Sequence, residues 1–245
     1  MHGNIKKIVT SDSDNLAKKG SEIFCKTANE TICQRDRFAV AISGGSTPRT
    51  MHRLLAQEPY LSDIPWQKTH IFWVDERMVA YNHPDSNFGT AKKDFLAKIP
   101  IPSDQVYPMP VTLRLEEGAD LYQAQLNTFF QNTASDFPVF DLILLGIGKD
   151  GHIASLFPGQ SSSQEPNRRV LSVRGGKPDV FRLTLNYNVL NNAKHILFLV
   201  SGSGKASIVK TIFEEGQARL PALRIRPLNG EMTWLLDQEA ALLLS

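Results

Sequence analysis

The chain has 245 residues, 42% of them hydrophobic, which is long enough to bury one large core. Its 27 basic and 25 acidic residues give a net charge of +2 without a long block of like charge, so nothing indicates a nucleic-acid-binding arm or an acidic tail. The apolar runs are far shorter than a membrane span, and segment 1–15 holds no apolar signal core, so we expect a cytoplasmic protein without a membrane partner. From the chain length and the charge distribution we expect one domain (residues 1–245) and no nucleic-acid partner.

Helical and strand-like segments alternate along the chain. In chain order we expect a helix over 14–33, a strand over 38–42, a helix after the turn 43–48, a strand over 71–74 that ends at 75–77, a helix over 86–98 capped by Ser86, and strands over 142–145 and 196–200. Strands that are apolar throughout and alternate with helices are typical of an α/β fold with a mostly parallel sheet covered on both faces.

Four loops that follow these strands carry polar residues. In an open parallel sheet, ligands bind beyond the carboxyl ends of the strands, so functional residues should lie in the loops just after them. The four loops are residues 43–48, 75–77, 146–152 and 201–205.

The loop 43–48 has the composition of an anion-binding turn. Its glycines let the backbone approach a ligand, and we expect Thr47 to be the helix N-cap with Pro48 at the first helical position. The free N–H groups at a helix start bind phosphate. A well-capped ordinary turn explains the segment equally well on its own. The candidate ligand-binding residues are Ser43, Gly44, Gly45, Ser46 and Thr47.

The loop 146–152 matches the G-x-G-x-x-G dinucleotide fingerprint at residues 146–151. However, residues 157–159 (Phe-Pro-Gly) break the helix that should follow, and the acidic residue expected about 20 positions later is missing, which argues against a dinucleotide. Asp150 and His152 are the strongest catalytic candidates, because imidazole titrates near neutral pH and a carboxylate can orient it. The alternative interpretation of Asp150 and His152 is that they belong to a polar turn without a catalytic role.

Three cationic residues are candidates for binding an anion. Lys205 follows two glycines, but Leu199 and Ala206 stand where a P-loop needs glycine and serine or threonine, so Lys205 is either a phosphate contact or a solvated lysine. Arg77 can bind phosphate, stabilise an oxyanion, or belong to a surface salt bridge. Arg182 lies in an apolar run and, if buried, needs an anionic ligand or an internal carboxylate.

Other chemical signatures are missing from the sequence. The remaining histidines have no metal-binding spacing, Cys25 and Cys33 lack the spacing of a zinc or redox site, and no Gly-x-Ser-x-Gly motif occurs. We therefore expect no metal and no cofactor. The arginines at 168–169 have no interleaved aromatic residues and are expected on the solvated surface.

In this order and spacing, the motifs resemble the 6-phosphogluconolactonase family. They are residues 41–48 (AISGGSTP), 75–77 (DER), 146–158 (GIGKDGHIASLFP), 182–185 (RLTL), 202–205 (GSGK) and 234–241 (WLLDQEAA). The resemblance implies a single three-layer, Rossmann-like α/β domain, similar to glucosamine-6-phosphate deaminase and ribose-5-phosphate isomerase. It also implies hydrolysis of 6-phospho-D-glucono-1,5-lactone to 6-phospho-D-gluconate in the oxidative pentose phosphate pathway.

The same resemblance implies roles for the candidate residues. Residues 43–47, Arg182 and Lys205 would bind the phosphosugar lactone. Arg77, Asp150 and His152 would lie at the reacting lactone, with His152 as general base. For the oligomeric state we expect a monomer or a weak homodimer.

Two alternatives remain. The deaminase shares the Gly-Gly-Ser turn but continues Gly-His-Ile-Ala-Phe-Asn-Glu, whereas residues 155–157 here leave an apolar residue in the place of the glutamate. It also has Asp-Glu-Tyr where this chain has residues 75–77. Both differences favour the lactonase. A phosphosugar-sensing domain of a transcriptional regulator is the non-enzymatic alternative, although no helix-turn-helix segment precedes Phe38.

Overall fold

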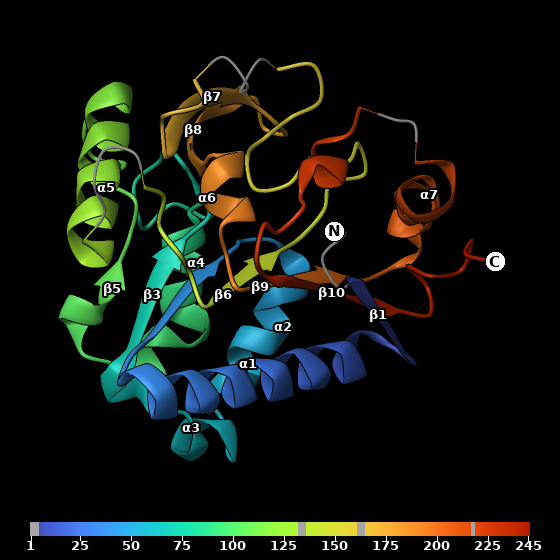
Figure 1. Ribbon diagram of the computed structural model, residues 1–245, viewed down its shortest axis with the longest axis horizontal. Helices are drawn as coiled ribbons and strands as arrows, with labels where there is room; N and C mark the ends of the chain where they lie inside the picture. The colour runs from blue at the N-terminus through green and yellow to red at the C-terminus, as the bar shows by residue number, and fades with distance from the viewer. Residues whose placement is uncertain (1–4, 132–135, 161–164, 217–218) are drawn as a thin grey trace.

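A computed structural model describes residues 5–131, 136–160, 165–216 and 219–245 (Figure 1). These residues form a seven-stranded parallel sheet in the order β1-β10-β9-β6-β2-β3-β5 and a three-stranded antiparallel sheet in the order β4-β8-β7. The strands are β1 (Ile5–Thr10), β2 (Phe38–Ile42), β3 (Thr69–Trp73), β4 (Asp75–Arg77), β5 (Val106–Tyr107), β6 (Leu142–Leu145), β7 (Val170–Gly175), β8 (Val180–Leu185), β9 (His195–Val200) and β10 (Glu231–Asp237).

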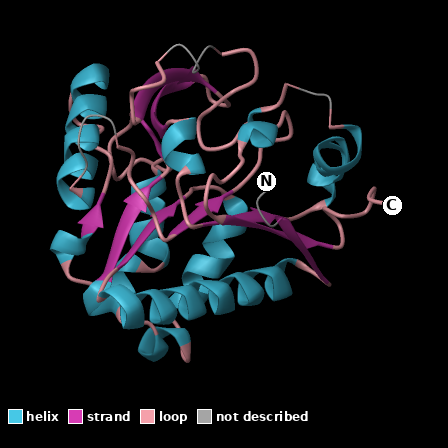
Figure 2. Cartoon of the chain, viewed as in Figure 1, coloured by secondary structure: helices cyan, strands magenta, loops and turns pink. Residues whose placement is uncertain are grey.

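Helices and the small sheet cover the large sheet from two sides. The helices are α1 (Ser13–Arg35), α2 (Ser46–Leu55), α3 (Tyr60–Asp63), α4 (Asn87–Asp94), α5 (Leu115–Phe130), α6 (Tyr187–Asn191) and α7 (Ala206–Lys210). Figure 1 shows α1, α2 and α3 on one side of the large sheet and α6 with the small sheet on the other; Figure 2 separates helices and strands by colour. The predicted three-layer α/β fold with a mostly parallel sheet is confirmed.

The central strands are buried on both faces because every residue in them is apolar. All residues of β2 and β6 are buried, as expected for strands covered by layers on both sides. The predicted strands 38–42 and 142–145 are confirmed to the residue, and 196–200 begins one residue earlier, at His195. The long amphipathic helix is confirmed as α1.

The predicted helix 86–98 is only partly helical. Ser86 is its N-cap, as expected, with its hydroxyl accepting from the N–H of Gly89 at 3.0 Å. The α-helix ends at Asp94, and residues 96–98 form a separate 3₁₀ turn. The prediction was therefore right at the start and too long at the end.

The segment Asp75–Arg77 does not end β3, as the sequence suggested, but forms β4 of the small antiparallel sheet. Val74 lies between the two sheets. Its N–H donates to the carbonyl of Ile42 at 3.0 Å, and its carbonyl accepts from the N–H of Leu185 at 2.8 Å. In the small sheet, Arg77 lies opposite Arg182. Two candidate arginines 105 positions apart in the sequence are thus neighbours.

One surface prediction was wrong. Arg169 is 4% exposed, and its guanidinium donates to the carbonyl oxygens of Asp136 and Asn167 and lies over the ring of Phe137. Arg168 instead forms ion pairs with carboxylates of α5 at the surface. The adjacent arginines therefore have different environments, and Arg169 is part of the packed interior.

Candidate active site

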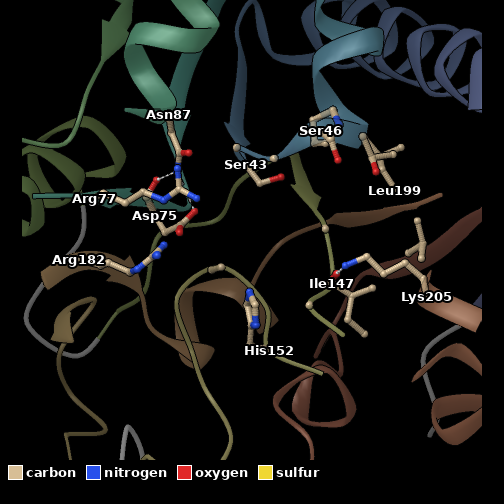
Figure 3. Close-up of a pocket in the computed structure, with 18 residues that line it drawn as sticks. Ser43, Ser46, Asp75, Arg77, Asn87, Ile147, His152, Arg182, Leu199 and Lys205 are labelled. Atoms are coloured by element: carbon tan, nitrogen blue, oxygen red, sulfur yellow. Dashed lines mark hydrogen bonds between the residues drawn. The ribbon is translucent and has the colours of Figure 1, made fainter. Parts of the chain in front are cut away.

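A pocket of about 210 Å³ opens where the strands of the large sheet end (Figure 3). Loops after β2, β6 and β9 contribute to its wall, as the parallel sheet predicts, and the small sheet and the start of α4 contribute the rest. Its lining residues are Ser43–Pro48, Asp75, Arg77, Asn87, Gly146–Gly148, His152, Ala154, Arg182, Leu199, Val200 and Lys205. Every candidate site residue from the sequence lines this pocket except Asp150, which contacts His152 from outside the lining.

The turn between β2 and α2 brings a helix N-terminus to the pocket. The helix begins at Ser46, and its N-cap is Gly45 with φ of 105°, without a side-chain cap. The expectation that Thr47 is the N-cap was wrong, because the glycine already makes the turn and Thr47 lies inside the first helical turn. Among the described residues, the buried hydroxyl of Ser43 has no hydrogen-bond partner. The turn therefore offers donors to an anion.

Asp150 and His152 form a hydrogen-bonded pair. The Nδ1 atom of His152 lies 2.6 Å from Oδ1 of Asp150, and the backbone N–H of His152 donates to the same oxygen at 3.2 Å. Burial opposes ionisation of Asp150, but the adjacent imidazole and its hydrogen bonds leave the pKa of Asp150 below its usual value. With Nδ1 held by the carboxylate, Nε2 is the nitrogen left for a proton transfer in the pocket.

Gly148 makes room for this pair. A β-carbon at position 148 would lie 2.1 Å from Nδ1 of His152 and 2.5 Å from Oδ1 of Asp150. The glycine in the nucleotide-like fingerprint thus serves close packing against the imidazole. Residues 152–157 form a tight turn instead of a helix, consistent with the expectation that no dinucleotide binds here.

The loop after His152 is tied to the small sheet. Ser155 is fully buried; its hydroxyl donates to Oδ2 of Asp75 at 2.6 Å, and its N–H donates to Oγ1 of Thr184 at 3.2 Å. Ala154, just before it, has φ of 46°, a left-handed conformation that costs free energy for a residue other than glycine. The surrounding contacts hold the strained residue in place and fix the position of the His152 loop.

Arg77 and Arg182 lie together on one side of the pocket (Figure 3). Arg77 donates through Nη1 to the carbonyl of Asp85 at 2.6 Å, while its buried Nε has no partner among the described residues. Arg182 is 4% exposed and donates through Nε to the carbonyl of Gly175 at 2.9 Å. Burial, and then the charge of Arg77, lower the pKa of Arg182. The buried arginine thus has backbone carbonyls as partners, and the pair forms a strongly cationic wall.

Lys205 lies on the other side of the pocket, next to Ile147 (Figure 3). It ends the 3₁₀ turn Ser203–Lys205 just before α7, and its Nζ donates to the carbonyl of Ile147 at 2.6 Å. Burial, and then the charge of Lys149, lower the pKa of Lys205. The half-buried ammonium and the N-terminus of α2 line the same pocket, and together they form a second cationic region.

The sequence did not single out Asp75 or Asn87, both of which line the pocket. Asp75 is 6% exposed, and the side-chain amide of Asn87 donates to its carbonyl at 2.8 Å. A signal existed for Asn87, since it directly follows the N-cap Ser86, and a helix start at a sheet edge is a common place for ligand contacts. For Asp75, the signal was its position two residues before Arg77.

The described residues contain no cluster of three or more histidine, cysteine, aspartate or glutamate side chains that could bind a metal ion. No helix in that part of the chain is long and apolar enough to cross a bilayer.

The fold and the pocket together define an α/β protein with a cation-lined pocket suited to a small anionic ligand. Residues 11–234 match the sequence model of the family described as glucosamine-6-phosphate isomerases/6-phosphogluconolactonase, and the chain belongs to this family.

Relatives with curated names support the same assignment. A protein of Synechocystis sp. named 6-phosphogluconolactonase is 41% identical over 89% of this chain and 90% of its own length. One of Rattus norvegicus with the same name is 38% identical over 86% of this chain and 82% of its own length.

Solved structures of related enzymes have the same fold as this chain. A 6-phosphogluconolactonase from Trypanosoma brucei superposes with a TM-score of 0.88 at 26% identity over 99% of this chain and 100% of its own. A monomeric glucosamine-6-phosphate deaminase superposes with a TM-score of 0.81 at 23% identity over 98% of this chain and 99% of its own. This second superposition shows that the deaminase has the same fold as the lactonase and as this chain.

Proposed function

We propose that this chain is a 6-phosphogluconolactonase, which hydrolyses 6-phospho-D-glucono-1,5-lactone to 6-phospho-D-gluconate. The observation that carries the proposal is the Asp150–His152 pair, 2.6 Å apart, with His152 facing a pocket that has cations on two sides. The names of the curated relatives support the choice of substrate.

The phosphate group binds at the start of α2, beside Lys205. Free N–H groups of the first helical turn, the hydroxyl of Ser43 and the ammonium of Lys205 are donors suited to a phosphate. This anchor orients the sugar ring so that its carbonyl carbon lies near His152, on the side of Arg77 and Arg182.

His152 is the general base. Its Nε2 removes a proton from a water molecule as the water oxygen attacks the lactone carbonyl, while Asp150 holds Nδ1 and stabilises the imidazolium that forms. Arg77 stabilises the negative charge on the carbonyl oxygen, with Arg182 beside it. The bond between C1 and the ring oxygen then breaks, and the imidazolium returns the proton to that oxygen. No cofactor takes part in these steps.

Residues 1–245 act as one domain, and the protein is a monomer or a weak homodimer of the cytoplasm. The continuous large sheet, which pairs β1 near the start of the chain with β10 near its end, supports the single domain. Light scattering over a range of protein concentrations tests the oligomeric state.

Replacing His152 with alanine should lower turnover by about 10²–10⁴-fold, because general-base assistance is lost while the fold is kept. The assay is hydrolysis of freshly generated 6-phosphogluconolactone in metal-free buffer, corrected for the spontaneous rate, with circular dichroism to check folding. Near-normal turnover in the variant would remove His152 from the mechanism.

Glucosamine 6-phosphate serves as a parallel substrate in the same assay. Ammonia release without lactone hydrolysis by the wild type would make the chain a deaminase. Binding of either phosphosugar without any turnover would make it a sensor.

Replacing Lys205 with alanine should raise KM by about tenfold or more with a smaller effect on kcat, since the proposed role of the lysine is to contact the phosphate and not the reacting carbonyl. Lys149→Ala is the matched control: this neighbouring lysine is exposed and does not line the pocket. An unchanged KM in Lys205→Ala would exclude the phosphate contact.

A further inference from the structure

Asp75 is the one acidic side chain among the described residues that line the pocket. The other charged lining groups are the guanidinium groups of Arg77 and Arg182, the ammonium of Lys205 and the imidazole of His152. A buried carboxylate in such a place weakens the binding of any anion nearby. A pocket that serves only to bind an anionic ligand would not contain this carboxylate.

The carboxylate of Asp75 is held rigidly. Its Oδ2 accepts from the hydroxyl of Ser155 at 2.6 Å, and the amide of Asn87 lies 3.4 Å from its Oδ1. Within the described part of the chain, none of the ion pairs within 4.0 Å involves Asp75. Its charge is therefore not cancelled by a direct salt bridge and acts on the pocket.

Asp75 belongs to one of two charged groups in the pocket. Besides burial, the charges that shift the pKa of Arg182 are those of Arg77, Asp75, Asp85 and Glu76. Besides burial, the charges that shift the pKa of Lys205 are those of Lys149 and Asp150. Figure 3 shows the same division, with Asp75 and both arginines on the side away from Lys205. If the phosphate binds beside Lys205, Asp75 lies at the end where the ester carbonyl reacts.

The reaction changes the charge at that end. The lactone carbonyl carbon carries no formal charge, but hydrolysis turns it into a carboxylate. We propose that Asp75 is a specificity-determining residue that makes the pocket favour the uncharged ester end of the lactone over the carboxylate end of the product. This inference rests on the proposed lactonase function. Without Asp75, the two arginines would retain the product carboxylate; with it, their attraction is offset and the product leaves.

Two ligands isolate this effect. 6-Phosphogluconate and glucitol 6-phosphate have the same open carbon chain and the same phosphate, but the first ends in a carboxylate and the second in an alcohol. The probe is the ratio of their dissociation constants, measured by calorimetry for the wild type and for Asp75→Asn. An asparagine at this position still accepts the hydrogen bond from Ser155 but carries no charge.

In the wild type we expect the two ligands to bind within about tenfold of each other. In Asp75→Asn, 6-phosphogluconate should bind about 10- to 100-fold more tightly relative to glucitol 6-phosphate, as expected when one like charge a few ångströms away is removed from a partly buried site. Product inhibition of the hydrolysis should increase in parallel.

Ser155→Ala is the control for position, because it removes the hydrogen bond to Asp75 and keeps the charge. It should retain the wild-type ratio. An unchanged ratio in Asp75→Asn, or the same change in Ser155→Ala, would overturn the proposal. If Asp75→Asn does not fold, the ratio of the two dissociation constants in the wild type provides the test. Binding of 6-phosphogluconate far more than tenfold tighter than binding of glucitol 6-phosphate would mean that Asp75 does not offset the arginines. Failure of both ligands to bind the wild type would instead count against the proposed function.

Discussion

The contact between Gly44 and Asn87 joins the two helix starts that border the pocket. A β-carbon at position 44 would lie 1.9 Å from Oδ1 of Asn87. The amide cannot easily turn away, because its Nδ2 donates to the carbonyl of Asp75 and the residue is 5% exposed. The glycine is therefore required by packing between the turn after β2 and the start of α4.

Replacing Gly44 with alanine should destabilise the protein by about 1–3 kcal/mol, the usual cost of a methyl group forced into a well-packed region. Urea denaturation measures the change. Gly146→Ala is the matched control, since a β-carbon there has no protein atom within 4 Å. Equal effects of the two substitutions on stability would show that the Asn87 contact is not limiting.

Residue types in loops after strands were enough to predict much of the pocket lining. His152, Asp150, Arg77 and Lys205 stand out in the sequence because each follows an apolar strand and carries a reactive or charged group. Asp75 lies in the loop 75–77 that the sequence indicates, but the direction of its side chain could not be predicted, since it depends on a hydrogen bond from Ser155, 80 positions away. Sequence patterns report local spacing, and contacts of this kind are not local.

At the level of elements, Glu76 fixes the start of α4 to β4. Its fully buried carboxylate accepts from the N–H groups of Asn87 at 2.8 Å and Phe88 at 2.7 Å, and from the hydroxyl of Ser86 at 3.1 Å. Burial raises the pKa of Glu76, and these backbone donors counteract the effect. A carboxylate at a helix N-terminus also interacts favourably with the helix dipole. The element that carries Arg77 is thereby held against the helix that carries Asn87.

Replacing Glu76 with glutamine should lower the free energy of unfolding by about 1–3 kcal/mol, because the NH2 group that replaces one carboxylate oxygen cannot accept from the donors that oxygen now serves, and these buried donors lose their acceptor. The measurement is urea denaturation at neutral pH. Glu30→Gln on α1 is the control, as Glu30 is exposed and forms only a 3.7 Å pair with Lys26. A loss in Glu76→Gln no larger than in the control would contradict the role.

For the whole molecule, the buried imidazole of His52 links stability to pH. It lies on α2, stacks on Phe95 at 4.8 Å between ring centroids, and its Nε2 has no partner among the described residues. Burial lowers the pKa of His52 to about 4, against an ordinary value of 6.5. In the unfolded chain this group protonates first, so acidification favours unfolding.

The free energy of unfolding should therefore fall as the pH decreases from about 6.5 to about 4, and His52→Leu should reduce this fall. Urea denaturation of both proteins at about pH 7 and about pH 5 provides the comparison, in which groups common to both cancel. Parallel losses of stability in the two proteins would show that His52 is not the group responsible.

The centre of the large sheet was predictable because β2 and β6 are apolar throughout and β9 is apolar after His195, a pattern typical of central parallel strands. The strands β1, β5 and β10 of this sheet were not among the expected elements. The small sheet was not predictable either. Its strand β4 has three charged residues and pairs with β8 more than 100 positions later, so its sequence resembles a surface turn. The second sheet therefore became evident only from the three-dimensional arrangement.

Val74 connects the two sheets. Its N–H donates to a carbonyl of β2, and its carbonyl accepts from an N–H at the end of β8. Arg77, Asp75 and Arg182 are on the small sheet, whereas the α2 turn and Lys205 belong to the large one. A ligand in the pocket therefore contacts both sheets at once and links two separately hydrogen-bonded layers of the molecule.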